Sequence, residues 1–448
     1  MPLRTSAQNR SSHSDHFQGP VRRDTPKKDE ISIMKKTGNL EIDGERLWDS
    51  IMEIAKIGAT EKGGSCRLAL TDLDREARDL FVSWCQDAGC SIAIDKMGNI
   101  FARRQGSDPD LYPVAVGSHL DTQPTGGRFD GVYGVLTGLE VIRTLNDHKI
   151  TTRHPIEAVC WTNEEGSRFA PAMVASGVFA GVYDLEFGLS REDKDGRTMG
   201  EELARIGYAG DQPMGRPLHA YLEAHIEQGP ILVEEQIDIG IVTDAQGQRW
   251  YELELNGTES HAGPTPMDRR RDALLAAARV VTLINDIGLA HAPLACATVG
   301  MMQVYPNSRN VIPGRVFMTI DIRHPDDAVL SKMDNLVRGG ISDITTAAGI
   351  SHDINQIFYY APISFDSSCV RAVTEAASTC GYSARQIVTG AGHDACFIAH
   401  AAPTSMIFIP CIDGISHNEV EDIHPAWSTQ GANVMLQTVL NKAEQLAG

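Results

Sequence analysis

The 448-residue sequence lacks the features that most readily identify membrane, secreted and nucleic-acid-binding proteins. It has no run of about eighteen uncharged apolar residues, which argues against a transmembrane helix. Its N-terminal stretch is basic but has no apolar segment like that of a secretory signal. The net charge of −19 disfavours nucleic acid or an anionic membrane as the main partner. A small anionic substrate remains compatible, because it needs only a local cationic pocket.

The sequence also lacks paired cysteines and internal repeats. Nine cysteines are scattered without a C-x-x-C spacing, which is typical of reduced thiols. We therefore expect a cytoplasmic protein without disulfides. The length predicts two or three domains, and 42% hydrophobic residues suffice for substantial cores.

Residues 1–38 are polar, charged and rich in turn-forming residues, so we expect a disordered extension. Alternating strand and helix patterns over residues 39–243 and 362–448 predict an α/β catalytic domain with a central, mostly parallel sheet flanked by helices. Residues 244–361 instead follow the order strand-helix-strand-strand-helix-strand. This order predicts an inserted α+β sandwich of the split βαβ type. Within it, residues 311–323 are expected to form one strand, and hinges are expected near 243–246 and 361–364.

The stretch from Gly117 to Gly134, GSHLDTQPTGGRFDGVYG, concentrates polar groups between glycines. His119 and Asp121 follow the apolar run PVAV, and Asp130 precedes a helical pattern. Ligands of open α/β sheets bind at the carboxyl ends of strands, and imidazole with carboxylate suits a divalent metal. We expect Asp121 to orient the imidazole of His119 rather than to bind metal. The alternative is a polar loop whose aspartate caps the helix.

Two further buried-strand patterns end in groups that can bind metal. PIEAVCW (155–161) is followed by Glu164 and Glu165, and AYLEAHIEQGP carries His225 near its end. Adjacent glutamates cannot point the same way, so one can bind metal while the other faces the reacting water; the alternative is two solvated loop acids. A fourth apolar strand, TSMIFIP, leads to a loop with His417. Convergence of such groups at strand ends favours one shared site.

Five ligands are too many for one catalytic zinc ion, which takes three. They suit two ions, about 3.5–4 Å apart, that share a bridging carboxylate and activate a water molecule. Asp130 is the natural bridge because glycines flank its approach. Glu164 would move the proton. Imidazole and carboxylate ligands without thiolates accept Zn, Mn, Co or Ni. The five candidate ligands are His119, Asp130, Glu165, His225 and His417.

The order H-x-D, G-G-x-x-D-G, E-E and a late histidine resembles the dinuclear metallo-aminopeptidase and aminoacylase superfamily. This resemblance implies that residues 244–361 are a lid or dimerisation domain inserted in the catalytic domain. The blocks SHLDTQPTGGRFDG, TNEEGSRF, HIEQGP, GTESHAGPTPM and RNVIPG are similar to its amidohydrolase branch. That branch contains N-carbamoyl-L-amino-acid hydrolases, β-ureidopropionases and allantoate amidohydrolases. The resemblance extends from about residue 40 to the end.

This resemblance implies the same five metal ligands, two divalent ions per subunit and Glu164 as catalytic acid and base. It implies that Gln228 faces the carbamoyl group and that His261, on the lid, stabilises the transition state. It further implies that Asn310 and Arg323 hold the substrate carboxylate, for which the guanidinium fork is well suited. Two positions keep a structural alternative: His261 could cap a loop, and Arg323 could be a solvated strand charge.

The function implied is hydrolysis of an N-carbamoyl-L-amino acid, or of N-carbamoyl-β-alanine, to the amino acid, CO2 and ammonia. The alternatives are an allantoate amidohydrolase, an aminoacylase or dipeptidase of the same superfamily, and a carboxylate-binding protein without turnover. We also expect a homodimer formed through the inserted domain. His393 and Asp394, in GAGHDA, either shape the pocket or close a turn.

Overall fold

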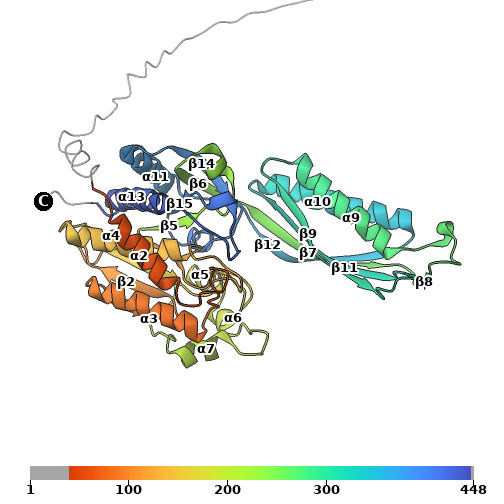
Figure 1. The fold of residues 1–448 in the computed structure, drawn as a ribbon, viewed down its shortest axis with the longest axis horizontal. Helices are drawn as coiled ribbons and strands as arrows, with labels where there is room; N and C mark the ends of the chain where they lie inside the picture. The colour runs from red at the N-terminus through yellow and green to blue at the C-terminus, as the bar shows by residue number, and fades with distance from the viewer. Residues whose placement is uncertain (1–39, 445–448) are drawn as a thin grey trace, which may run out of the picture. The chain divides into compact units, whose positions relative to one another are not determined.

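The computed structural model describes residues 40–444, so the extension expected over residues 1–38 lies outside the described residues. A nine-stranded mixed sheet forms one part of the fold (Figure 1). Its four central strands are parallel to one another, which confirms the predicted α/β class. In pairing order the strands are β1 (Ser91–Ile94), β2 (Ile100–Arg104), β4 (Ile156–Trp161), β3 (Val114–His119), β5 (Ala220–Ile226), β15 (Thr404–Ile409), β6 (Ile239–Ala245) and β13 (Ile363–Ser364), with β14 (Ala384–Thr389) beside β6.

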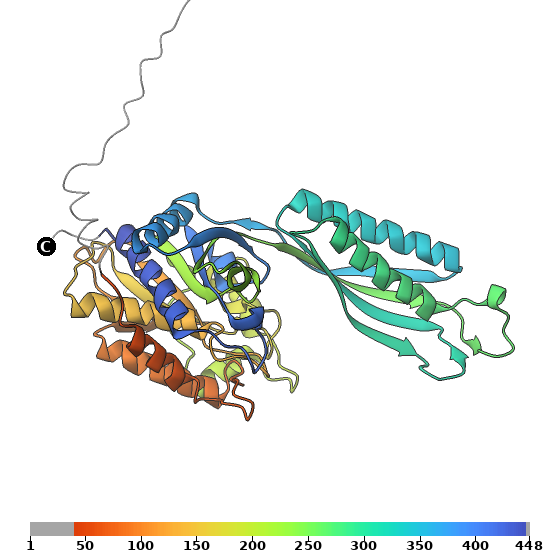
Figure 2. The same ribbon diagram turned by 45° about the horizontal axis from the view of Figure 1, so that its top comes forward.

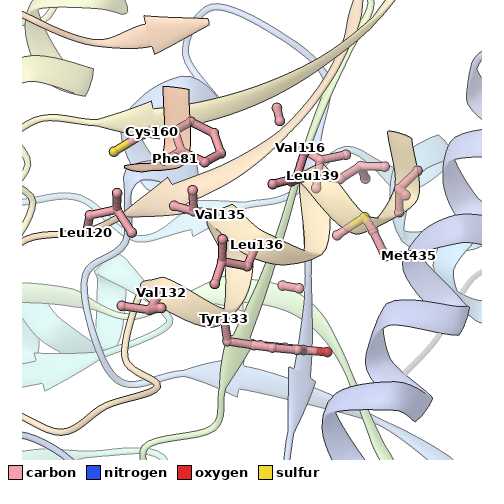
Figure 3. Close-up of a cluster of buried hydrophobic side chains, with 14 of the residues drawn as sticks. Phe81, Val116, Leu120, Val132, Tyr133, Val135, Leu136, Leu139, Cys160 and Met435 are labelled. Atoms are coloured by element: carbon pink, nitrogen blue, oxygen red, sulfur yellow. The ribbon is translucent and has the colours of Figure 1, made fainter. Parts of the chain in front are cut away.

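Helices cover both faces of this sheet, so its central strands are buried along their whole length. On one face, α4 (Val132–Asp147) contacts β3, and Val135 and Leu139 lie near Val116 (Figure 3). On the other face, α12 (Asp394–Ile398) packs with Trp161 and Phe408. The remaining helices of this part are α2 (Gly44–Ile54), α3 (Asp72–Asp87), α5 (Val174–Phe179), α6 (Leu185–Leu189), α7 (Met199–Ile206), α8 (Ile231–Glu235), α11 (Ser367–Cys380) and α13 (Pro425–Lys442).

A second, four-stranded sheet is antiparallel throughout and pairs in the order β12-β7-β11-β9. Helices α9 (Ala273–Ala290) and α10 (Asp327–Ala348) pack on one of its faces (Figure 2). The strand order and the two helices match the split βαβ arrangement. The other face is open and carries side chains such as Met301 and Trp250. Its strands are β7 (Gly247–Asn256), β9 (Cys296–Tyr305), β11 (Arg315–His324) and β12 (Ser351–Tyr360).

Helix α9 is the one helix of residues 40–444 that is long and apolar enough to cross a membrane. Its buried face, which includes Val280 and Ile284, packs against the four-stranded sheet. The helix also carries Arg279 and Asp286. A core helix passes the same test of length and composition, so this is weak evidence for a membrane span.

Two details differ from the sequence expectations, and short strand segments occupy the two places where hinges were expected. Residues 311–323 form two strands, β10 (Val311–Ile312) and β11, because Pro313 has no N–H to donate to a sheet. Residues 243–245 end strand β6, which pairs with both β15 and β14. Residues 363–364, where the second hinge was expected, form β13 and pair with the end of β6. Helix α13 was not expected; most of its residues are buried, so it shows no single apolar stripe.

Candidate metal centre

The parallel centre of the large sheet brings four distant segments to one edge. Strand β3 ends at His119, β4 ends three residues before Glu164, β5 contains His225, and β15 leads to the loop with His417. Since β4, β3, β5 and β15 are parallel neighbours, their carboxyl ends lie together. The structure thereby places all five candidate ligands and Glu164 around one cavity of about 210 Å³.

Asp130 lies at the centre of these groups. Its Oδ1 is 3.0 Å from Nε2 of His225 and 3.8 Å from Nε2 of His119. Its Oδ2 is 3.2 Å from Nε2 of His417, and that nitrogen is 3.4 Å from Oε2 of Glu165. Two groups suited to a metal ion therefore share Asp130: it joins His119 and His225 on one side, and Glu165 and His417 on the other.

Backbone carbonyls orient two of the imidazoles. Nδ1 of His119 lies 2.8 Å from the carbonyl oxygen of Asp121, and Nδ1 of His225 lies 2.8 Å from that of Ile226. A ring fixed in this way presents Nε2 to a metal. The Asp121 carboxylate is 3.9 Å from the ring of His119 and instead accepts the N–H groups of Glu164 and Glu165, each at 3.2 Å. Asp121 thus holds His119 through its carbonyl and the glutamates through its side chain, whereas the sequence suggested only the former task.

Two residues that the sequence did not single out support the ligands. Gln123 donates to Glu165 from its backbone N at 3.0 Å and from Nε2 at 2.6 Å. Glu421 accepts the N–H of Asp130 at 3.1 Å and the hydroxyl of Ser416 at 2.7 Å. The only sequence feature that could have indicated Glu421 is its position four residues after His417, a candidate ligand.

The charges of the site favour cations. Among residues 40–444, no lysine or arginine forms an ion pair with Asp130, Glu164 or Glu165. Burial raises the pKa of Glu165 to about 8 and that of Glu164 well above its usual value, and neighbouring carboxylates add to both effects. A divalent cation would relieve this crowding of acids. The nitrogen and oxygen donors therefore fit two divalent metal ions with Asp130 between them.

Two of the residues expected to bind substrate line the same cavity. Arg323, on β11, donates from Nη2 to Oδ2 of Asp321 at 2.7 Å and from Nη1 to the carbonyl of Gly390 at 2.8 Å. Gln228 donates from Nε2 to Oδ2 of Asp130 at 3.1 Å. His393 also lines the cavity, as do Gln248 and Trp250 of β7, which the sequence did not single out.

His261 and Asn310 are not brought to this cavity. They lie at β8 (Ser260–His261) and just before β10, at the end of the four-stranded sheet away from the large sheet (Figure 1). Both side chains are exposed. Nδ1 of His261 accepts the N–H of Gly263 at 3.0 Å, and the carbonyl of Asn310 accepts the N–H of Ala262 at 2.9 Å. Within one described chain, these residues are neighbours of each other and not of Asp130.

Comparison with known proteins finds a matching family and several similar chains. Residues 115–441 match the peptidase family M20/M25/M40. An N-carbamoyl-L-amino-acid amidohydrolase from Rhizobium meliloti is 52% identical over 91% of this chain and 98% of its own length. An allantoate amidohydrolase from Bacillus subtilis is 33% identical over 84% of this chain and 92% of its own. The crystal structure of an amidase of the hydantoinase/carbamoylase family from Burkholderia multivorans is 67% identical, with a TM-score of 0.87 over 90% of this chain and 98% of that one.

Proposed function

Because the chain belongs to the peptidase family M20/M25/M40, we propose that it is a metal-dependent amidohydrolase that cleaves the carbamoyl C–N bond of N-carbamoyl-L-amino acids. With one water, the products are the amino acid, CO2 and ammonia. The observation that carries the proposal is the pair of ligand groups sharing Asp130, in one cavity with Glu164 and Arg323. The name of the Rhizobium meliloti relative supports this substrate class. The same chemistry would serve N-carbamoyl-β-alanine.

We place two divalent ions, Zn, Mn, Co or Ni, at the two groups of ligands. His119, Asp130 and His225 would hold one, and Asp130, Glu165 and His417 the other. When bound, such ions polarise a carbonyl group and lower the pKa of a water molecule.

Glu164 is the acid and base of the proposed reaction. It is buried in the cavity wall, with Oε2 3.5 Å from Nε2 of His119. Its carboxylate takes a proton from the attacking water as the C–O bond forms. It returns that proton to the leaving nitrogen as the C–N bond breaks. Its place in the cavity beside His119 lets it hold the proton between these two steps.

Arg323 and Gln228 would orient the substrate. The guanidinium fork can bind the substrate carboxylate through two hydrogen bonds, in place of its present contacts with Asp321. Gln228, which contacts Asp130, lies where the carbamoyl group must approach. The substrate would therefore span the cavity from Asp130 to Arg323, and both residues line it.

Ammonia release from a panel of compounds tests the function. Metal-loaded protein should release ammonia from N-carbamoyl-L-amino acids or N-carbamoyl-β-alanine, and the Glu164→Gln variant should not. Faster turnover of allantoate, the substrate named for the Bacillus subtilis relative, would reassign the substrate within the family. Faster turnover of N-acetyl amino acids or dipeptides would indicate an aminoacylase or dipeptidase. No hydrolysis with any of the four metals would leave only binding of a carboxylate.

We further propose that residues 244–361 act as a lid and form a two-fold homodimer. Helix α9 exposes an apolar set that includes Leu275, Val281 and Leu289, the last 68% exposed. Strands β9 and β12 are the two edges of the four-stranded sheet. An apolar helix beside an unpaired strand suits pairing with a second copy. Closure of the lid or a partner subunit could then supply His261 to the cavity.

Subunit mixing tests this arrangement. If His261 acts on the partner's site, inactive His261→Ala and inactive Glu164→Gln proteins should regain part of the activity after subunit exchange. If it acts within its own chain, mixed dimers contain no intact site and stay inactive. Sedimentation of the wild-type protein as a monomer at micromolar concentration would refute the dimer.

A further inference from the structure

The two halves of the metal centre differ in how their histidines are held. His119 and His225 are buried, lie in strands β3 and β5, and have Nδ1 fixed by backbone carbonyls. The His417 side chain is 52% exposed and belongs to a loop. Its φ of 54° is uncommon for a residue other than glycine. Within residues 40–444, no hydrogen bond from a protein group to its Nδ1 is found. The position of His417 therefore depends on how its loop is held.

Glu421 connects that loop to the bridging aspartate. Its side chain is 1% exposed. Its Oε1 accepts the backbone N–H of Phe129 at 3.0 Å and that of Asp130 at 3.1 Å. Its Oε2 accepts the hydroxyl of Ser416, the neighbour of His417, at 2.7 Å. One carboxylate thus joins the segments that carry two ligands almost 300 residues apart.

The surroundings leave Glu421 little freedom to move. A Cβ added to Gly127 would collide with its carboxylate, so the 126–130 turn closes directly over it. The Ser416 hydroxyl has one proton and lies 3.5 Å from Oδ2 of Asp130, farther than from Glu421. Its proton is therefore directed to Glu421, which leaves its oxygen to accept Nε2 of Gln228 at 3.2 Å.

We propose that Glu421 is a positioning residue that fixes His417 relative to Asp130 and thereby sets the occupancy of the metal site formed by Asp130, Glu165 and His417. The proposal rests on the proposed two-ion centre but concerns metal binding alone. A carboxylate is needed because all three of its neighbours donate. A glutamine at this position keeps one accepting oxygen, and its NH2 group cannot accept the Ser416 hydroxyl.

The site of His119 and His225 should depend on Glu421 much less. The carbonyls that orient these histidines belong to Asp121 and Ile226, which do not contact Glu421. Asp130 is common to both sites, but its carbonyl also accepts the N–H of Val132 at 2.7 Å, at the start of α4. Loss of Glu421 should therefore affect the two sites unequally.

Metal titration of full-length protein tests this inference. Protein freed of metal with a chelator is titrated with Co²⁺ or Zn²⁺ by calorimetry, and bound metal is measured after dialysis. The wild type should bind two equivalents. Glu421→Gln should keep one tight equivalent and bind the second about 10–100-fold more weakly, as is typical when a partner of a metal ligand is removed. The matched control is Glu419→Gln in the same loop, whose carboxylate faces Lys62 at 3.3 Å; it should bind as the wild type does.

Three results would decide against the proposal. Two equivalents bound by Glu421→Gln with wild-type affinities would show that the carboxylate is dispensable. Equal weakening of both sites would show general damage to the loop. If Glu421→Gln fails to fold, Ser416→Ala removes only one of its three contacts and should show the same selective loss; unchanged affinity for the second ion would then refute the role. A wild type that binds fewer than two ions would refute the two-ion centre itself.

Discussion

Asp121 offers a direct test of how the adjacent Glu164 and Glu165 are held. Its buried carboxylate accepts the backbone N–H groups of Glu164 and Glu165, each at 3.2 Å. A buried donor without a partner costs about 1–3 kcal/mol. Asp121→Ala should therefore lower the free energy of unfolding by about 2–6 kcal/mol, from two such donors. Asp121→Asn keeps one accepting oxygen and should lose about half as much.

The assay is urea unfolding of metal-free protein followed by circular dichroism, so that loss of metal binding does not contribute. The control is Asp147→Ala, which removes an exposed carboxylate 2.8 Å from Arg46 and should change stability by about 0–1 kcal/mol. His119 should keep its orientation in every variant, because the Asp121 backbone carbonyl is unchanged. Equal stability of the Asp121→Ala variant and the wild type would refute this account of the loop.

The stability difference between the wild type and Asp121→Ala should also depend on pH. Burial, with the charge of Asp74 adding, raises the pKa of Asp121 to about 7 in the folded metal-free protein, against about 3.9 in an unfolded chain. The folded state then binds the proton more tightly than the unfolded state. The contribution of this group to wild-type stability therefore falls as the pH rises from about 4 to about 7, by up to about 1.4 kcal/mol per pH unit. The stability difference between wild type and Asp121→Ala should therefore be larger at pH 5 than at pH 8. A difference that grows with pH would contradict this reasoning.

Three further outcomes follow from the geometry. Glu164→Gln should retain two metal ions while kcat falls by about 10²–10⁴-fold, measured by ammonia release with metal analysis of the same sample; a near-normal kcat would reassign the proton transfer. Arg323→Lys should raise KM more than it lowers kcat in steady-state kinetics, because an ammonium cannot bind a carboxylate through two parallel hydrogen bonds. Iodoacetamide at pH 8 should label exposed Cys296 well before Cys160, whose pKa burial raises to about 12, as peptide mass spectrometry would show.

The convergence of the candidate ligands on one cavity could be predicted, because four of the five lie in or after a buried apolar strand. His119 and His225 lie in the last residues of β3 and β5, and parallel neighbours bring such ends together. The role of the Asp121 carboxylate could not be predicted, because the spacing of H-x-D does not say which oxygen meets the ring. The role of Glu421 could not be predicted either, because its partners include backbone N–H groups of a segment 291 residues away.

The fold class could be predicted from alternating patterns, while several elements depend on contacts that the sequence does not display. Strand β6 occurs where a hinge was expected, because its IGIV run is buried between β15 and β14. Helix α13 is buried on most sides and so lacks the one-sided pattern that reveals surface helices. The strand expected over residues 311–323 is interrupted at Pro313, where the chain passes from the two-stranded sheet of β8 and β10 to the four-stranded sheet.

The pairing of β6 with β13 has a consequence for how this chain could have been assembled in evolution. Asp244 faces Ser364, whose hydroxyl donates to the aspartate at 2.7 Å, and Ala245 faces Ile363. The polypeptide therefore departs from the large sheet and rejoins it at one place, so the intervening stretch occupies the position of a hairpin turn. A genetic insertion at such a turn need not shift the register of any strand. An ancestral hairpin could thus have been lengthened into a second sheet without moving the candidate ligands at the strand ends of the large sheet.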